Sequence, residues 1–159
     1  MKTGLCIIVV LAGAALDLAA KAWARASLEP YGHAADFLPF ISLRLTFNEG
    51  VSFSLLSFDH GGGRLALLAF TGLLTLGLAI WAYRMPHGGE RLALSAIIAG
   101  ALANFLDRAV NGVVTDYLDL HFGDWHPFIF NLADVWISVG ALLLVALQIF
   151  AKEKRPAAV

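Results

Sequence analysis

The chain has 159 residues, of which 59% are hydrophobic and 14% are charged, and its formal net charge is −1. In a soluble domain about a quarter of the residues are charged. The composition therefore predicts one integral membrane domain over residues 1–159. The near-zero net charge gives no indication of nucleic-acid binding. Because Cys6 is the only cysteine, an intrachain disulfide is excluded.

Four apolar segments predict four transmembrane helices. A hydrocarbon layer of about 30 Å requires about 20 apolar residues in a helix, and the segments near this length are Thr3–Ala24, Leu65–Tyr83, Leu92–Val110 and Phe128–Phe150. The first segment also resembles a cleaved signal peptide, with Lys2 before its apolar run. That run is longer than an ordinary signal-peptide core, which favours a retained span.

The first span contains two charged residues, Asp17 and Lys21. Residues four apart share one face of a helix, so these two side chains are expected to form an ion pair. Charges within a membrane are costly and need a reason. For Lys21 we favour the ion pair with extension toward the interface, whereas for Asp17 a structural role and a substrate contact remain equal alternatives.

The segment between the first two spans is expected to form a small sheet. In Ile41–Asn48, apolar and polar residues alternate with period two, which is typical of a half-buried strand. Residues 51–58 resume an extended pattern, and the glycine-rich stretch 59–63 predicts a turn before the second span.

The third span ends with three polar residues on one face, Asn104, Asp107 and Arg108. A polar clamp between helices suffices to explain Asp107. The guanidinium of Arg108 is a planar set of donors that suits carbonyl or carboxylate oxygens, so this residue is a candidate for orienting a ligand or Asp116.

The second outer segment also alternates, and this singles out Asp116. If residues 114–122 are extended, Asp116 shares a face with Val114, Leu118 and other apolar residues, while Asp119 lies on the opposite, wetter face. Burial would therefore perturb Asp116 and leave Asp119 unaffected.

The fourth span begins with Asn131 and Asp134. One interpretation is that Asn131 caps the helix and Asp134 stabilises its first turn. The other, which we favour, is that Asp134 acts with Asp116, because both lie at the outer ends of consecutive spans. Two close carboxylates cannot both ionise cheaply, so one keeps a proton and the pair provides a general acid and a general base.

Three further residues, His121, Asp124 and His126, are candidate zinc ligands by residue type, but their spacing matches no common metal motif. No serine, glycine-rich phosphate-binding or zinc-protease motif is present in the sequence. We therefore expect no metal and no cofactor.

An even number of spans places both termini on the same side of the membrane. A small excess of lysine and arginine on that side predicts that it is cytoplasmic. Residues 27–63 and 112–127 then face outward. The expected fold class is an all-α membrane protein with four transmembrane helices and a small extracytoplasmic sheet and loop.

Four sequence blocks, "DLAAK", "FNEGVSFS", "NFLDRAVNGVVTDY" and "FNLAD", resemble those of the lipoprotein signal peptidase (signal peptidase II) family, in the same order over almost the whole chain. The resemblance implies an aspartic endopeptidase of the bacterial inner membrane, with its site at the outer face. Such an enzyme removes signal peptides from prolipoproteins on the amino side of a diacylglyceryl-modified cysteine. It implies contact with membrane lipid and with cyclic-peptide inhibitors of the globomycin type.

The resemblance also implies roles for individual residues. The catalytic pair would be Asp116 and Asp134, and the substrate-binding residues would be Asp17, Asn48, Gly50, Asn104, Arg108 and Asn131. The chain departs from the usual family pattern at Leu18, Ser52, Ala103 and Tyr117. The alternatives are a catalytically divergent paralogue and a small proton- or ion-coupled membrane transporter.

Overall fold

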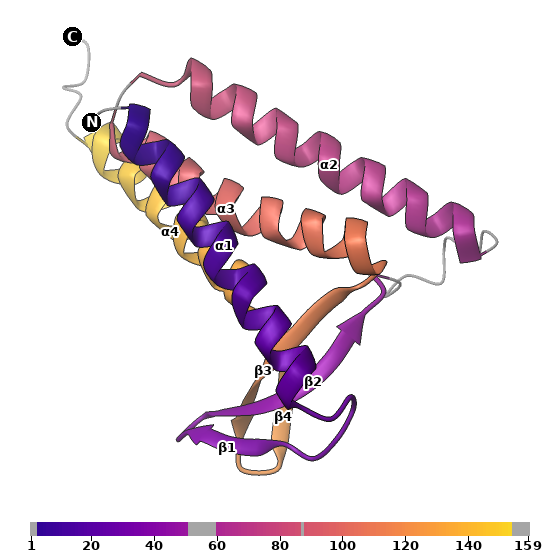
Figure 1. Cartoon of the computed structure of the whole chain (residues 1–159). Coiled ribbons are helices and arrows are strands. Elements are labelled where there is room, and N and C mark those ends of the chain that lie inside the picture. Colours follow the sequence, from indigo (N-terminus) through magenta and orange to yellow (C-terminus); the bar gives the residue numbers. More distant parts are fainter. Residues whose placement is uncertain (1–2, 51–59, 87, 154–159) are drawn as a thin grey trace, which may run out of the picture.

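The protein, described here by a computed structural model, forms four helices with a sheet at one end of them (Figure 1). The structure describes residues 3–50, 60–86 and 88–153. The elements in chain order are α1 (Thr3–Ser27), β1 (Ala35–Leu38), β2 (Ile41–Asn48), α2 (His60–Arg84), α3 (Gly89–Asn111), β3 (Val114–Phe122), β4 (Trp125–Phe130) and α4 (Leu132–Glu153).

All four helices are long and apolar enough to cross a membrane, which confirms the predicted spans. α1 begins and α4 ends at the same end of the helices, remote from the sheet (Figure 1). α1 packs against α3 and α4, as expected of a helix that belongs to the fold.

Two predicted boundaries are wrong. The fourth helix begins at Leu132 rather than Phe128, because Phe128 and Phe130 pair with Leu120 and Leu118 of β3 as the end of a strand. α2 begins at His60, so Gly61–Gly63 belong to the first turn of the helix and do not form a separate loop. The apolar residues that follow them stabilise the helix. The extended pattern expected over residues 51–58 lies outside the described residues.

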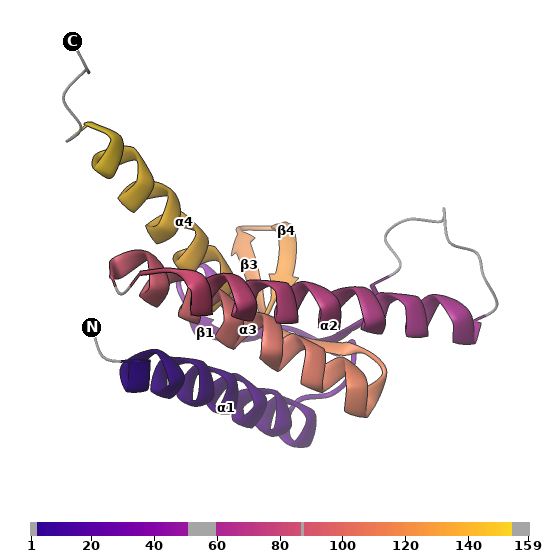
Figure 2. The ribbon, with the colours of Figure 1, turned by 90° about the horizontal axis from the view of Figure 1, so that it is seen from above.

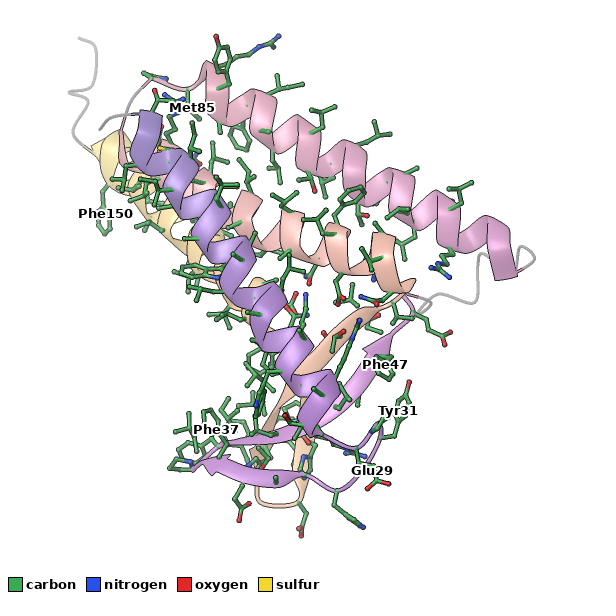
Figure 3. All side chains as sticks on the ribbon, in the orientation of Figure 1. Glu29, Tyr31, Phe37, Phe47, Met85 and Phe150 are labelled. Carbon is green, nitrogen blue, oxygen red and sulfur yellow. The ribbon has the colours of Figure 1, made fainter. Side chains whose placement is uncertain are left out.

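α3 is the central helix, since it packs against α1, α2 and α4 (Figure 2). Half of the residues in the most apolar part of α3 are buried, compared with 6% for α2. Side chains of α2 extend both toward α3 and away from it (Figure 3). α3 and α4 approach closely at two glycines: an added Cβ on Gly100 would overlap the Ala133 carbonyl, and one on Gly140 would meet the Ala93 carbonyl. Small residues at crossing points permit such contacts in membrane bundles.

The sheet is antiparallel throughout, in the order β1-β2-β3-β4. The alternation predicted for β2 and β3 is confirmed as extended structure, whereas β1 was not predicted. The sheet joins the helices through a cluster in which Leu45 and Tyr117 pack against Ala24 of α1. Beside this cluster the rings of Tyr31 and Phe47 meet edge to face, with centroids 5.9 Å apart (Figure 3).

The prediction that Asp119 lies on a wet face is wrong, because its side chain is completely buried. β3 is an inner strand, and both neighbouring strands cover this carboxylate. Its two oxygens lie 3.0 and 2.9 Å from Nδ1 of His126 on β4, and Nη1 of Arg44 on β2 lies 3.9 Å away.

Candidate active site

The N-terminus of α4 is built around Asn131, whose side chain is completely buried. Its Oδ1 accepts a hydrogen bond from the Asp134 amide (3.0 Å), and its own amide donates to Oδ2 of Asp134 (3.1 Å). This reciprocal pair is the arrangement of a capping box. The capping interpretation of Asn131 and Asp134 is therefore correct as geometry.

The same Asn131 also reaches the other predicted aspartate. Its Nδ2 donates a hydrogen bond of 2.6 Å to Oδ1 of Asp116 on β3. Asp116 is 5% exposed, which confirms the burial expected from the alternation. Capping is thus compatible with pairing of the two aspartates, because Asn131 contacts the Asp116 carboxylate through Nδ2 and the Asp134 carboxylate through its backbone amide.

Two further side chains from other elements fix the first turn of α4. The Leu132 amide donates to the hydroxyl of Tyr117 on β3 (3.3 Å), and the Ala133 amide donates to Oδ1 of Asp17 on α1 (2.8 Å). The first amides of a helix lack partners within it. Here they are satisfied by buried groups of β3 and α1, which hold the start of α4 against both.

Asp17 and Lys21 form the predicted ion pair, with Nζ and Oδ2 2.7 Å apart. The predicted extension of Lys21 toward the interface is wrong, because its side chain is 2% exposed and turns to α3. Lys21 Nζ also donates to Oδ1 of Asn104 on α3 (2.6 Å), and Asn104 Nδ2 donates to Oδ1 of Asp134 (3.0 Å). A continuous polar chain therefore runs from α1 through α3 to α4.

Asp107 forms the polar clamp expected of it. Its Oδ2 accepts from the Thr115 amide (2.7 Å), and its Oδ1 accepts from Arg25 Nη2 (2.7 Å) and from Asn111 Nδ2 (2.9 Å). Arg25 also donates to the Thr115 hydroxyl. This clamp fixes the residue that precedes Asp116.

The sequence interpretation gave Arg25 no role in the site. Asp17, Lys21 and Arg25 recur at intervals of four residues on α1, so they follow one face of the helix. Extending the Asp17–Lys21 argument by one turn would have found Arg25.

Burial sets the electrostatics of the strand-borne groups. The pKa of Asp116 is raised to about 6, and loss of water is the largest cause. The charge of Asp134 acts in the same direction, while the amides of Asn131 and Asn48 oppose the shift. Burial likewise raises the pKa of Tyr117 to about 12. Asp116 is thus a carboxyl that holds its proton more tightly than an exposed aspartate.

Asn48, Gly50 and Arg108 lie together near this carboxylate pair. The Gly50 amide donates to Asn48 Oδ1 (2.8 Å), and Gly50 has φ 77°, the left-handed region that favours glycine. An added Cβ on Gly50 would lie 3.4 Å from Nη2 of Arg108. Arg108 is 7% exposed, and its buried Nε has no hydrogen-bond partner among the described residues.

Two of the three candidate zinc ligands, His121 and His126, make other contacts. The rings of His121 and His126 stack with centroids 5.6 Å apart, and His126 contacts Asp119 instead of Asp124. Within residues 3–50, 60–86 and 88–153, no three histidine, cysteine or acidic side chains are grouped to hold a metal ion.

The departures from the usual family pattern are accommodated in the fold. Ala103 is fully buried in a cluster with Ala14 and Ala133, and Leu18 packs against that cluster. Tyr117 adds the hydroxyl that accepts from Leu132. Ser52 lies outside the described residues.

The fold and the site define a multi-pass membrane protein in which a sheet and the last helix bring two aspartates, the buried Asp116 and the partly buried Asp134, to one asparagine. Residues 8–150 match the family described as signal peptidase (SPase) II, and the chain belongs to this family.

Individual relatives agree. A lipoprotein signal peptidase of Hydrogenovibrio crunogenus is 35% identical over 154 residues, covering 96% of this chain and 87% of the relative. One of Brucella ovis is 37% identical over 116 residues, covering 72% of this chain and 71% of the relative.

Two solved bacterial membrane enzymes share the fold. One has a TM-score of 0.81 at 23% identity and covers 92% of this chain and 93% of its own. The other has a TM-score of 0.80 at 24% identity, with 99% and 95% covered.

Proposed function

We propose that the protein is an aspartic endopeptidase that removes signal peptides from prolipoproteins, on the amino side of a diacylglyceryl-modified cysteine. The observation that carries this proposal is the buried Asn131, which hydrogen-bonds to both Asp116 and Asp134. Membership of the signal peptidase II family and the names of the relatives support the substrate class.

The two carboxyls take different parts in the reaction. Asp134 accepts hydrogen bonds from Asn104 Nδ2 and from the Asn131 amide, which suits an anion. Asp116 holds a proton more tightly because it is buried. Asp134 therefore serves as the general base and Asp116 as the general acid.

Asp134 takes a proton from water while the water oxygen bonds to the scissile carbonyl carbon. Asp116 then gives its proton to the departing amide nitrogen as the carbon–nitrogen bond breaks. Transfer of the proton on Asp134 to Asp116 restores the starting state.

Substrate contacts are assigned from the free donor of Arg108 and from the residues that lie beside it. Arg108 offers a buried guanidinium whose Nε is unused in the described part of the chain, and Asn48 and Gly50 lie beside it. We assign these three residues to the peptide backbone. Asp17 and Asn104 already contact Ala133, Lys21 and Asp134, which favours a positioning role over direct substrate contact.

The proposal includes a place in the cell. The protein lies in the bacterial inner membrane with both termini in the cytoplasm, so that the sheet and the aspartates face outward. Membrane lipid surrounds the helices, and the exposed apolar side chains of α2 support this. Cyclic peptides of the globomycin type are proposed as inhibitors of the same site.

The test is cleavage of a lipidated prolipoprotein by purified protein in detergent. Asp116→Asn and Asp134→Asn should each abolish cleavage while the variants still fold. Asp119→Asn is the matched control, since Asp119 is also buried on β3 but contacts His126; it should retain cleavage. Full activity in either of the first two variants would overturn the aspartic mechanism.

The transporter alternative has less support. Thr71 and Thr75 of α2 donate their hydroxyl protons to carbonyls of their own helix, Thr71 to Leu67 (2.9 Å) and Thr75 to Thr71 (2.7 Å). Their hydroxyl protons are therefore already used within α2, and residues 65–83 contain no charged side chain. Proton or ion flux in liposomes that depends on Asp116 would favour transport over cleavage.

A further inference from the structure

Lys21 is enclosed to a degree that an ion pair alone does not require. Its side chain is 2% exposed, although lysines in apolar segments ordinarily extend toward water. Nζ lies 2.7 Å from Asp17 Oδ2 and 3.8 Å from Asp107 Oδ2, and it donates at 2.6 Å to Oδ1 of Asn104. The ammonium thus joins α1 to the α3 residue that contacts Asp134.

The Asn104 amide has one orientation that suits both of its neighbours. An ammonium group only donates hydrogen bonds, so the amide oxygen must face Lys21. The amide nitrogen then faces Asp134, which accepts at 3.0 Å. Reversing the amide would place donors against donors at Lys21 and two oxygens against each other at Asp134.

We propose that Lys21 is a positioning residue for the cleavage reaction. By fixing the orientation of the Asn104 amide, it keeps a hydrogen-bond donor on Asp134 and holds that carboxylate in the anionic form that activates water. This inference rests on the proposed aspartic mechanism and adds a third helix, α1, to the control of the general base.

The simpler role for Lys21 is to neutralise Asp17. Several charged groups surround the Lys21 ammonium, so the experiment must separate neutralisation of Asp17 from orientation of the Asn104 amide. The groups are Asp17 on α1, Asp107 and Arg108 on α3, Asp116 on β3 and Asp134 on α4, with Arg25 paired to Asp107.

A double-mutant cycle separates the roles. The pH dependence of kcat/KM is measured for wild type, Lys21→Met, Asp17→Asn and the Asp17→Asn/Lys21→Met double variant. In the double variant position 17 has no charge left to neutralise, and Arg25 still pairs with Asp107. It therefore folds even where Lys21→Met alone fails to.

Loss of the oriented donor should shift the acidic limb of the kcat/KM profile to higher pH by about one unit. A shift of this size corresponds to the loss of one hydrogen bond to a charged group. kcat should fall at least about tenfold with KM nearly unchanged, because only the reacting carboxylate is affected. The same changes should separate the double variant from Asp17→Asn. Identical profiles for those two variants would show that Lys21 only neutralises Asp17.

Two controls complete the design. Leu94→Ala removes a fully buried side chain in another cluster of α3, ten residues before Asn104, and should lower thermal stability without moving the acidic limb. Infrared titration of isotope-labelled aspartates follows Asp134 without turnover, so an inactive Asp17→Asn background still gives an answer. If Asp134→Asn retains cleavage, the proposed aspartic mechanism fails. If Asp134→Asn is inactive but replacement of Lys21 does not shift the acidic limb, only the positioning role of Lys21 fails.

Discussion

Replacing Asp116 with asparagine should stabilise the folded protein at neutral pH while it removes activity. Burial raises the pKa of this carboxyl from 3.8 to about 6. Each unit corresponds to about 1.4 kcal/mol, so ionising the folded protein at pH 7.5 costs about 3 kcal/mol relative to the unfolded chain. Asparagine keeps an acceptor for Asn131 and carries no charge, so it avoids this cost.

The pH dependence has a definite sign. Below pH 4, Asp116 is protonated in both states and no cost arises. Between pH 4 and 6 the folded state binds more protons than the unfolded state, so the stability of the wild type falls as pH rises. The advantage of Asp116→Asn should therefore grow from pH 4 to pH 6 and remain constant above it.

Thermal unfolding followed at Cys6 measures this advantage. Cys6 is 7% exposed and is the only thiol in the chain, so a fluorogenic maleimide reports its exposure. A difference of about 3 kcal/mol should raise Tm by about 6–12 °C at pH 7.5. A Tm for Asp116→Asn equal to or below that of the wild type at pH 7.5, after subtraction of the difference at pH 4, would refute the reasoning.

Three other substitutions test the geometry, each by the same unfolding assay. Tyr117→Phe removes the acceptor for the first amide of α4 and should cost about 1 kcal/mol; no change in Tm would show that this bond contributes nothing. Gly50→Ala should cost about 1–3 kcal/mol, because φ is 77° and an added Cβ would overlap the Leu67 side chain; KM should rise, and an unchanged KM would remove Gly50 from the substrate site. Gly100→Ala should cost about 1–3 kcal/mol through overlap with the Ala133 carbonyl, and a neutral result would mean that α3 and α4 separate easily.

The four spans could be predicted because membrane helices are identified by length and apolar composition. The boundary between β4 and α4 could not. Phe128 and Phe130 are as apolar as the helix that follows, and only their pairing with Leu120 and Leu118 makes them a strand. A continuous apolar run does not reveal which backbone groups already have partners.

The candidate site was predictable to the extent that it depends on local alternation. The period-two pattern placed Asp116 on a buried face, and the structure agrees. The same pattern assigned Asp119 to water, because alternation gives the face of a residue but not what covers that face. Asp119 is covered by Arg44, from a strand distant in sequence, and by His126, from the strand after the next turn. This burial arises only when the strands pair into a sheet.

The capped start of α4 has a consequence for biosynthesis. The ribosome makes Asp17 and Tyr117, which receive the amides of this helix, before it makes the helix itself. In the proposed mechanism, a nascent chain that has not yet inserted its fourth span possesses Asp116 but lacks Asp134, the proposed general base. That mechanism therefore implies that peptidase activity arises only late in translation.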